Sequence, residues 1–354
     1  MARTALQTPV SPKPTAAEIR AALAENTGLR ARDVATKLGI TEADLVAAQV
    51  GQGTTRIAAS PDILMPAVCG LGEVMALTRN ASAVHERTGT YGDWHPGTHA
   101  AMILGPEIDL RIFPSHWVHA FATRNDSGNG PSRSLQVFDA TGQAVHKVYP
   151  REGTDLAAWD RAVAALATGE ASDTLDLSPP VDPDPAKSRP EKAAELRAAW
   201  AKMTDTHQFL RLVSRMKMNR LGAYRTAGAP FAVPLAPGAL NAALVACAAD
   251  AVPLMIFVGN RGCIQIHSGT ISTLREMGPW QNVLDARFNL HLRLDRVAEV
   301  WLVEKPTRRG PAQSIEAFTA EGELILQLFG DRKEGQEDTA AFARMCEALP
   351  KPAV

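Results

Sequence analysis

The chain has 354 residues, which is enough for about two domains that each bury a hydrophobic core. Its 37 basic and 38 acidic residues give a formal charge of −1, so no overall field attracts nucleic acid or an anionic membrane. The four cysteines are scattered without a CxxC pair, which argues against a zinc site or a disulfide framework and favours a reducing cytoplasm.

The N-terminal half has the pattern of one α+β unit. Residues 1–16 lack the apolar stretch of a secretory signal, so we expect a disordered lead-in and a cytoplasmic protein. Amphipathic patterns predict helices within residues 17–50 and 155–167, and alternating apolar residues in IDLRIF and WVHAFATR predict strands between them. Residues 17–167 therefore form the first predicted unit.

A linker and a second unit follow. Residues 168–190, TGEASDTLDLSPPVDPDPAKSRP, are rich in Pro, Asp and Ser and have no periodicity, which is typical of a linker. Helices within residues 191–227 and 337–348 and strands at FNLHLRL and EVWLVEK make residues 191–354 the second unit. The apolar stretch 229–258 is interrupted by prolines and polar residues, which favours a buried helix and strand over a membrane span.

The two units are copies of each other. Residues 134–149 (SLQVFDATGQAVHKVY) align without gaps with residues 314–329 (SIEAFTAEGELILQLF), an offset of 180. In both, alternating apolar residues flank a turn at Gly142 or Gly322, which predicts an antiparallel hairpin. Other matches at this offset are Asn80 with Asn260, Gly89 with Gly269, and Leu110 with Leu290. We therefore predict an α+β tandem repeat, each half a large antiparallel β-sheet flanked by α-helices, with a ligand cleft between the halves.

Positions that differ between the copies are candidates for a specialised role. At the same offset Arg111 is opposite His291, Phe113 is opposite Arg293, and Arg332 is opposite Glu152. Either these residues contribute to a ligand site where the halves meet, or they drifted on the surface after the duplication.

Four motifs carry a resemblance to a known family. They are GEVMALTRNASAVHERTGTY (72–91), EIDLRIF (107–113), MTDTHQF (203–209) and QLFGDRKEGQ (327–336). With these motifs in this order, the duplication and the linker, nearly the whole chain resembles the HemS/HmuS/ChuS/PhuS family of bacterial haemin-handling proteins. The resemblance implies paired antiparallel-sheet repeats flanked by helices, with one haem in the cleft between them.

The resemblance also implies roles for individual residues. It makes His207 the axial ligand of the haem iron, Arg111 the distal arginine on the opposite face of the porphyrin, and Phe113 a pocket aromatic. Further pocket positions that it assigns are Phe329, where a relative has tyrosine, Arg332, and Lys305 on the propionate side. One branch of the family has extra histidines next to the axial position, and these are missing next to His207. His85 matches a second histidine that is implicated in additional haem binding in some relatives. His291 is a further candidate for a second site.

The sequence context of His207 is suited to binding iron. Haem requires an apolar slot, a neutral nitrogen for iron, and cationic or hydrogen-bonding groups for its propionates. We expect His207 in the first turn of a helix capped by Asp205, where the positive end of the helix dipole keeps the imidazole neutral. Arg211 and Arg215 follow on roughly the same helix face, where they either reach propionates or point into solvent.

Arg111 lies in an alternating strand. In IDLRIF, the aliphatic residues Ile108, Leu110 and Ile112 should face the core, which directs Arg111 and Phe113 to the other face. An arginine beside an aromatic residue there is suited to the face of a large ring. The alternative is an exposed ion pair between Arg111 and Asp109.

Two functions agree with these features. One is a cytoplasmic haem-binding protein that receives imported haem from the import machinery and passes it to a downstream acceptor for iron acquisition. The other is a haem-degrading monooxygenase, with Arg111 as its distal catalytic residue, that opens the porphyrin oxidatively and releases iron. No nucleotide, flavin or iron–sulfur motif is present, so the second function requires an external electron donor. Carriage requires less of the sequence, so we predict it first.

Overall fold

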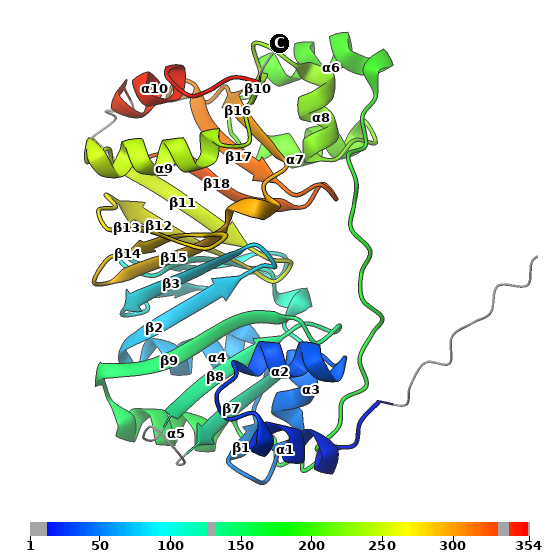
Figure 1. The fold of residues 1–354 in the computed structure, drawn as a ribbon, viewed down its shortest axis with the longest axis vertical. Coiled ribbons are helices and arrows are strands. Elements are labelled where there is room, and N and C mark those ends of the chain that lie inside the picture. Colours follow the sequence, from blue (N-terminus) through cyan, green and yellow to red (C-terminus); the bar gives the residue numbers. More distant parts are fainter. Residues whose placement is uncertain (1–12, 126–131, 332–339, 353–354) are drawn as a thin grey trace, which may run out of the picture.

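The two repeated hairpins form as predicted. The computed structural model describes residues 13–125, 132–331 and 340–352 (Figure 1). In it, β8 (Ser132–Phe138) pairs with β9 (Ala144–Thr154), and β17 (Ala312–Phe318) pairs with β18 (Leu324–Gly330), both antiparallel. Gly142 and Gly322 have φ of 79° and 89°, a left-handed conformation that glycine adopts without a steric penalty.

Helices open and close both halves. The helices of the first half are α1 (Ala16–Glu25), α2 (Ala31–Leu38), α3 (Glu42–Ala47), α4 (Pro61–Cys69) and α5 (Leu156–Leu166), with a 3₁₀ turn, η1, at Pro114–His116. Those of the second half are α6 (Ala193–Ala201), α7 (Gln208–Arg215), α8 (Arg220–Ala227), α9 (Ala239–Ala249) and α10 (Ala340–Glu347), with 3₁₀ turns η2 (Pro190–Lys192) and η3 (Leu294–Arg296). Residues 168–189 contain no helix or strand and run along one side of the molecule (Figure 1).

Three strands of each half join the sheet of the other half, which the sequence analysis did not predict. The first sheet has the order β1-β7-β8-β9-β2-β3-β15-β14-β13, and the second has the order β10-β16-β17-β18-β11-β12-β6-β5-β4. Besides β8 and β9, the strands of the first half are β1 (Thr54–Arg56), β2 (Gly72–Arg79), β3 (Ala83–Gly89), β4 (Asp93–His95), β5 (Ala101–Leu104), β6 (Asp109–Ile112) and β7 (His119–Asn125). The second-half strands are β10 (Ala232–Leu235), β11 (Leu254–Gly259), β12 (Cys263–Gly269), β13 (Leu274–Met277), β14 (Trp280–Leu284), β15 (Phe288–Arg293) and β16 (Glu299–Lys305). The two halves are therefore interleaved, and Arg111 lies in the sheet that takes most of its strands from the second half.

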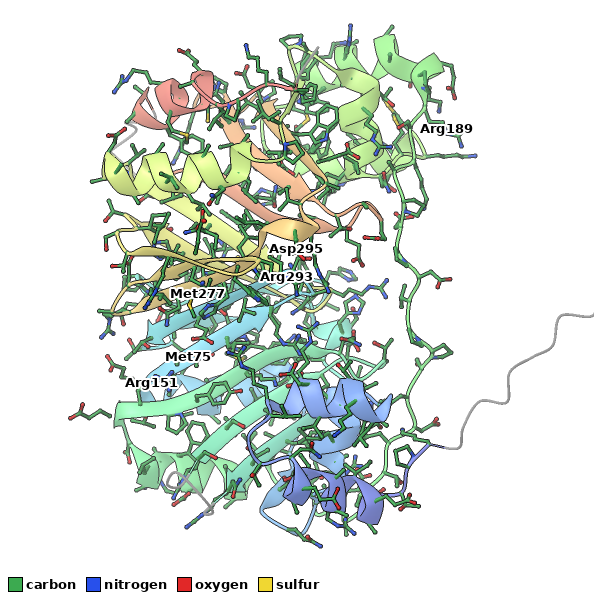
Figure 2. All side chains as sticks on the ribbon, viewed as in Figure 1. Met75, Arg151, Arg189, Met277, Arg293 and Asp295 are labelled. Atoms are coloured by element: carbon green, nitrogen blue, oxygen red, sulfur yellow. The ribbon has the colours of Figure 1, made fainter. Side chains whose placement is uncertain are left out.

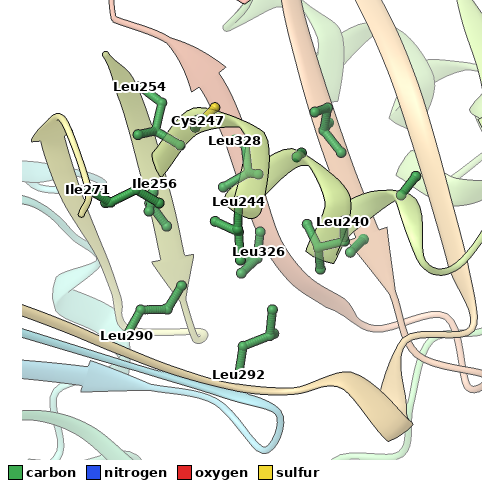
Figure 3. Packing of buried hydrophobic residues seen from close by; sticks show 14 of the residues in the cluster. Leu240, Leu244, Cys247, Leu254, Ile256, Ile271, Leu290, Leu292, Leu326 and Leu328 are labelled. Atoms are coloured by element: carbon green, nitrogen blue, oxygen red, sulfur yellow. The ribbon is translucent and has the colours of Figure 1, made fainter. Parts of the chain in front are cut away.

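The exchanged strands and the helices pack in the same hydrophobic clusters. On the second sheet, α9 and α10 pack over β11, β17 and β18, and the exchanged strand β15 contributes Leu290 and Leu292 to the same cluster (Figure 3). Both leucines are fully buried, and such burial contributes about 1.5–3 kcal/mol per side chain. The first sheet has an equivalent cluster with α4 and α5, to which β6 contributes Leu110 and Ile112. Each sheet therefore keeps one face in the core.

The helices α6 to α8 form a separate cluster on the second sheet. Trp200, Phe209 and Tyr224 pack together with ring-centroid distances of 4.6 to 5.9 Å, and Trp301 of β16 lies against Tyr224. Because these aromatic side chains come from all three helices and from the sheet, they fix α7 against β16 and β17. The N-terminal end of α7 is thereby fixed relative to the second sheet.

Two expectations concern the ends and the apolar stretch. Most of the expected lead-in, residues 1–12, lies outside the described residues, and α1 begins at Ala16 with Thr15 as its cap. The apolar stretch 229–258 forms the buried helix α9 and strand β11 as predicted, and also the short strand β10 before them. None of the helices in the described ranges is both long and apolar enough to span a membrane.

Candidate functional site

Arg111 lies on one face of the second sheet, here called the outer face, where its cross-strand partner is Ile264. Ile108, Leu110 and Ile112 are fully buried on the opposite face, which confirms the predicted alternation. Nη1 of Arg111 donates to the Asp109 carboxylate and to the backbone oxygen of Leu110 at 3.1 Å. Burial raises the pKa of Asp109, although the positive charge of Arg111 opposes this shift. The ion pair that the sequence left as an alternative is therefore formed, while 31% of the Arg111 side chain stays exposed.

Aromatic side chains lie on the same outer face. Phe113 directly follows β6, and its backbone N–H donates to Gly262 at 2.9 Å. Phe329 on β18 packs against Phe257 of β11, with ring centroids 4.9 Å apart. The sequence analysis missed Phe257, although the alternation in LMIFVG would have placed it opposite the buried Leu254, Ile256 and Val258.

The outer face separates Arg111 from Phe329. Between β6 and β18 lie β12 and β11, so the two side chains are three strand spacings apart, about 14–15 Å across the sheet. The positions between them on this face carry Ile264, Ile266, Phe257 and Met255. The outer face is therefore an apolar strip with a cation at one end.

His207 lies in the turn before α7, and its side chain is 91% exposed. The expected cap is wrong: α7 begins at Gln208 with His207 itself at the N-cap position. The reason is a tighter local turn, in which Asp205 Oδ1 accepts the backbone N–H of His207 at 2.8 Å. The same oxygen lies 2.7 Å from His207 Nδ1. These two bonds, backbone first, lower the pKa of the Asp205 carboxyl.

This contact determines which ring nitrogen of His207 is available. A carboxylate can only accept a hydrogen bond, so in the neutral imidazole Nδ1 carries the proton and Nε2 keeps its lone pair. Within the described part of the chain, Nε2 has no hydrogen-bonding partner. A histidine held by a carboxylate in this way is the usual arrangement of an imidazole that binds a metal.

The turn that carries His207 is attached to the second sheet. The Thr204 backbone oxygen accepts a hydrogen bond from Arg308, in the loop between β16 and β17, at 3.0 Å. Phe209, two residues after His207, is buried over the Nζ of Lys305 at 4.9 Å from the ring centroid. By strand register Lys305 shares the outer face with Phe329, because β16, β17 and β18 are neighbours. His207 and Arg111 therefore flank the same face from its two ends.

Lys305 is buried in an ion-pair network. Its side chain is 3% exposed, and Nζ donates to Glu316 at 2.7 Å and to the Tyr224 hydroxyl at 3.1 Å. Arg220 donates to the same carboxylate at 2.9 Å. A buried ammonium committed to this network is not free to meet a propionate, which favours a structural role for Lys305 over the predicted one.

Two other candidates are also placed. His85 is fully buried between the sheets and neither ring nitrogen has a partner in the described residues, so it is closed to a second haem. Burial is also the main cause that lowers the pKa of His85 well below its usual value. Arg332 lies outside the described residues.

A cavity of about 480 Å³ lies where the two halves meet. Its wall includes Phe257 and Ile264 of the outer face, Asn80 and Asn260 at equivalent positions of the two halves, and Val181 of the connecting segment. None of the predicted site residues within the described ranges lines it. Arg111 and Phe329 nevertheless contact its wall, because Arg111 pairs with Ile264 and Phe329 packs on Phe257.

Comparisons with known proteins cover most of the chain. The family model described as "Haemin-degrading HemS.ChuX domain" matches residues 39–166 and 217–349, one stretch in each half. The hemin transport protein HmuS of Yersinia pestis is 39% identical over 318 residues, 90% of this chain and 92% of that protein. Holo-PhuS, a heme-binding protein from Pseudomonas aeruginosa, has a TM-score of 0.90 at 40% identity, covering 96% of this chain and all of that one (100%). The heme degrading enzyme ChuS of Escherichia coli O157:H7 has a TM-score of 0.84 at 34% identity, covering 93% and 96%.

Proposed function

Because this chain belongs to the HemS/ChuS/PhuS family, we propose that it binds haem over the outer face of the second sheet, with His207 as the iron ligand. The observation that carries this proposal is the state of His207. Its Nδ1 is held by Asp205 and its Nε2 is free, at the end of an apolar face that has Arg111 at the other end. Such a set supplies the nitrogen, the slot and the distal cation that haem requires.

The remaining chemistry comes from the surrounding side chains. Phe113, Phe257 and Phe329 offer apolar contacts to the ring. Phe329 has no hydroxyl, so the hydrogen bond of a tyrosine at this position is lost. Arg211, exposed on α7 four residues after His207, replaces Lys305 as the cation for a propionate. Arg332, which lies outside the described residues, stays a proposed pocket residue.

The biological role that we propose is haem trafficking in the cytoplasm. The protein would take imported haem from the import machinery, shield its apolar faces and release it to an acceptor. An exposed histidine on one side of the iron suits release, because a partner protein can approach it without unfolding of the site. The relatives described as hemin transport and heme-binding proteins support this reading.

Haem degradation is the second candidate. The similarity to a heme degrading enzyme favours it, and so does Arg111, which keeps 31% of its side chain exposed and would lie on the side of a bound ring away from His207. Bound haem would supply the redox chemistry, while the chain's own contribution would be to orient the ring and to hold a cation at its distal face. Electrons would have to come from a separate donor.

Binding is tested by titrating haemin into the wild type, His207→Ala and the control His99→Ala, while the Soret band is recorded. His99 is an exposed histidine in a loop of the first half. We expect His207→Ala to shift the band and weaken binding by about tenfold or more, with no change in the control. An unchanged spectrum and affinity in His207→Ala would exclude this ligand.

A second experiment separates the two roles. The haem complex is supplied with an electron donor in the presence of catalase, and the pigments are analysed. A defined ring-opened tetrapyrrole that forms despite catalase would establish degradation. Intact haem that moves to apo-myoglobin would support trafficking, and bleaching that catalase prevents is peroxide chemistry unrelated to either role.

A further inference from the structure

The two halves carry a histidine and an arginine at equivalent places, but with the residues exchanged. In the second half, His207 is the N-cap of α7 and Arg111 lies on the sheet that α7 approaches. In the first half, Arg30 is the N-cap of α2, which like α7 is the second helix of its half, although the residue at the offset of 180 from His207 is Thr27. The sheet position that matches Arg111 at that offset is His291 of β15. The first half therefore contains the same two functional groups in the opposite arrangement.

His291 is held in the way that His207 is held. Its Nδ1 lies 2.6 Å from Oδ1 of Asn282, and the amide nitrogen of Asn282 donates to the backbone oxygen of Arg275 at 2.9 Å. This second bond fixes the amide so that its oxygen faces the ring, and Nδ1 must then be the donor. Nε2 is left without a hydrogen-bonding partner among the described residues. Both histidines thus present a bare Nε2.

The surroundings of His291 resemble the apolar strip of the second sheet, except that Glu86 stands where that strip has Ile266. The face of the first sheet that carries His291 is here called the equivalent face. Strand register places Val84 opposite His291, and Leu77, Met75 and Tyr149 follow on β2 and β9 (Met75 is labelled in Figure 2). At the offset of 180 these four residues match Ile264, Phe257, Met255 and Phe329. Tyr149 has the hydroxyl that Phe329 lacks.

Charges of both signs act on His291 at the equivalent face. Burial lowers the pKa of His291, Glu86 opposes this shift, and the positive charge of Arg30 adds to it. Arg30 lies close enough to influence the ring, yet its side chain is exposed and makes no hydrogen bond or ion pair within the described ranges. An unpaired guanidinium near a bare imidazole nitrogen leaves a cation available to a carboxylate.

We propose that the equivalent face of the first sheet is a second binding site for an anionic metalloporphyrin, with Nε2 of His291 as the metal ligand and Arg30 at its rim. The chemical class of this ligand rests on the function proposed above, but the site shares no residue with the one at His207. The protein would then carry two haems, one on each side of its interleaved sheets.

Haemin titrations of four proteins test this site. They are the wild type, His207→Ala, His291→Ala and the double variant, with His99→Ala as a control. We expect two equivalents bound by the wild type and the control, one by each single variant, and none with a histidine-ligated spectrum in the double variant. Asn282→Ala should weaken only the His291 step, by about 10- to 100-fold, because it releases the ligand from its acceptor.

The outcomes separate the two proposals. Two equivalents in His291→Ala, or one equivalent in the wild type that disappears in His207→Ala, would overturn the second site. A wild type that loses one equivalent in His291→Ala and none in His207→Ala would keep the second site and exclude the proposed ligand of the first. Retention of the His207 step in His291→Ala also shows that this variant is folded.

Discussion

Asn80 and Asn260 make equivalent hydrogen bonds on opposite sides of the junction between the halves. Asn80 donates to the backbone oxygens of Gly259 and Ile325 at 3.0 and 2.8 Å, and Asn260 donates to those of Arg79 and Val145 at 3.0 and 2.8 Å. Each carboxamide oxygen also accepts two backbone N–H groups of its own turn. This pair connects the first sheet to the second beside the central cavity.

The variant Asn80→Ala should therefore destabilise the whole molecule. It leaves two backbone carbonyls and two N–H groups without their partner, which we expect to cost about 2–4 kcal/mol. Urea unfolding followed by fluorescence measures the change. The matched control is Asn289→Ala, whose side chain makes no hydrogen bond within the described residues. Equal stability of the two variants would contradict this role of the junction.

Asp205 should tune haem binding without touching haem. Asp205→Ala removes the acceptor that holds His207 Nδ1 and its backbone N–H, so the ring is free to rotate. We expect haemin affinity to fall by about 10- to 100-fold. Asp205→Asn keeps an acceptor oxygen and should fall in between, and Asp182→Ala in the exposed connecting segment serves as the control. If Asp205→Ala binds haemin like the wild type, the carboxylate does not orient the ligand.

Lys305 should prove structural. Burial would raise the pKa of Glu316, but the charges of Lys305 and Arg220 lower it to about 2. We expect Lys305→Met to destabilise the protein by about 3–5 kcal/mol, because it leaves a buried carboxylate with one cation fewer. Haemin affinity should stay at the wild-type value. Weaker haemin binding with unchanged stability would instead restore Lys305 to the propionate side.

The Glu316 carboxylate should make the free energy of unfolding fall at low pH. Its folded pKa lies below the unfolded value, so its contribution is complete above about pH 4.5 and is lost as the pH falls towards 2. In Glu316→Gln this part of the acid-side decline should disappear. Unfolding free energies from urea titrations at several pH values between 5 and 2 provide the comparison.

The sequence predicted the repeat, the hairpins and the helices because these depend on local patterns. Alternation around Gly142 and Gly322 specifies a hairpin whatever lies beyond it. The exchange of β4 to β6 for β13 to β15 was not predictable, because edge-strand partners are chosen by long-range packing and not by the strand's own residues. The alternating apolar pattern around Leu110 and Leu290 would be the same whether β6 and β15 join the sheet of their own half or that of the other half.

The site was predictable to a similar extent. His207 and Arg111 came from the family resemblance, and the face of Arg111 followed from alternation. The burial and ion pairing of Lys305 depend on Glu316, which is eleven residues away along the chain. The two residues become neighbours only when β16 pairs with β17, so this contact was not predictable from the sequence. The hydrogen bond from His207 to Asp205 was within reach of the sequence, because Asp commonly accepts the N–H two residues on.

Buried histidines between the sheets should make the protein sensitive to mild acid. Burial, with a smaller effect from Arg87, lowers the pKa of His267 to about 4, and burial lowers that of His146 to about 3. Arg87 can only donate, so its contact with His267 Nδ1 at 3.5 Å requires that nitrogen to be unprotonated. The unfolded chain takes up these protons near pH 6.5, whereas the native state does so only near pH 4 and pH 3.

Stability should therefore fall as the pH is lowered from about 6.5 to about 4, by about 1.4 kcal/mol per pH unit for each such histidine. The variant His267→Phe can keep the ring stacking on Phe288, whose centroid lies 3.8 Å away, but it no longer titrates. We expect its unfolding free energy to decline less steeply over this interval, because one fewer histidine takes up a proton on unfolding. His99→Phe, at an exposed position, should retain the wild-type slope. A slope in His267→Phe equal to that of the wild type would show that His267 is already protonated in the native state.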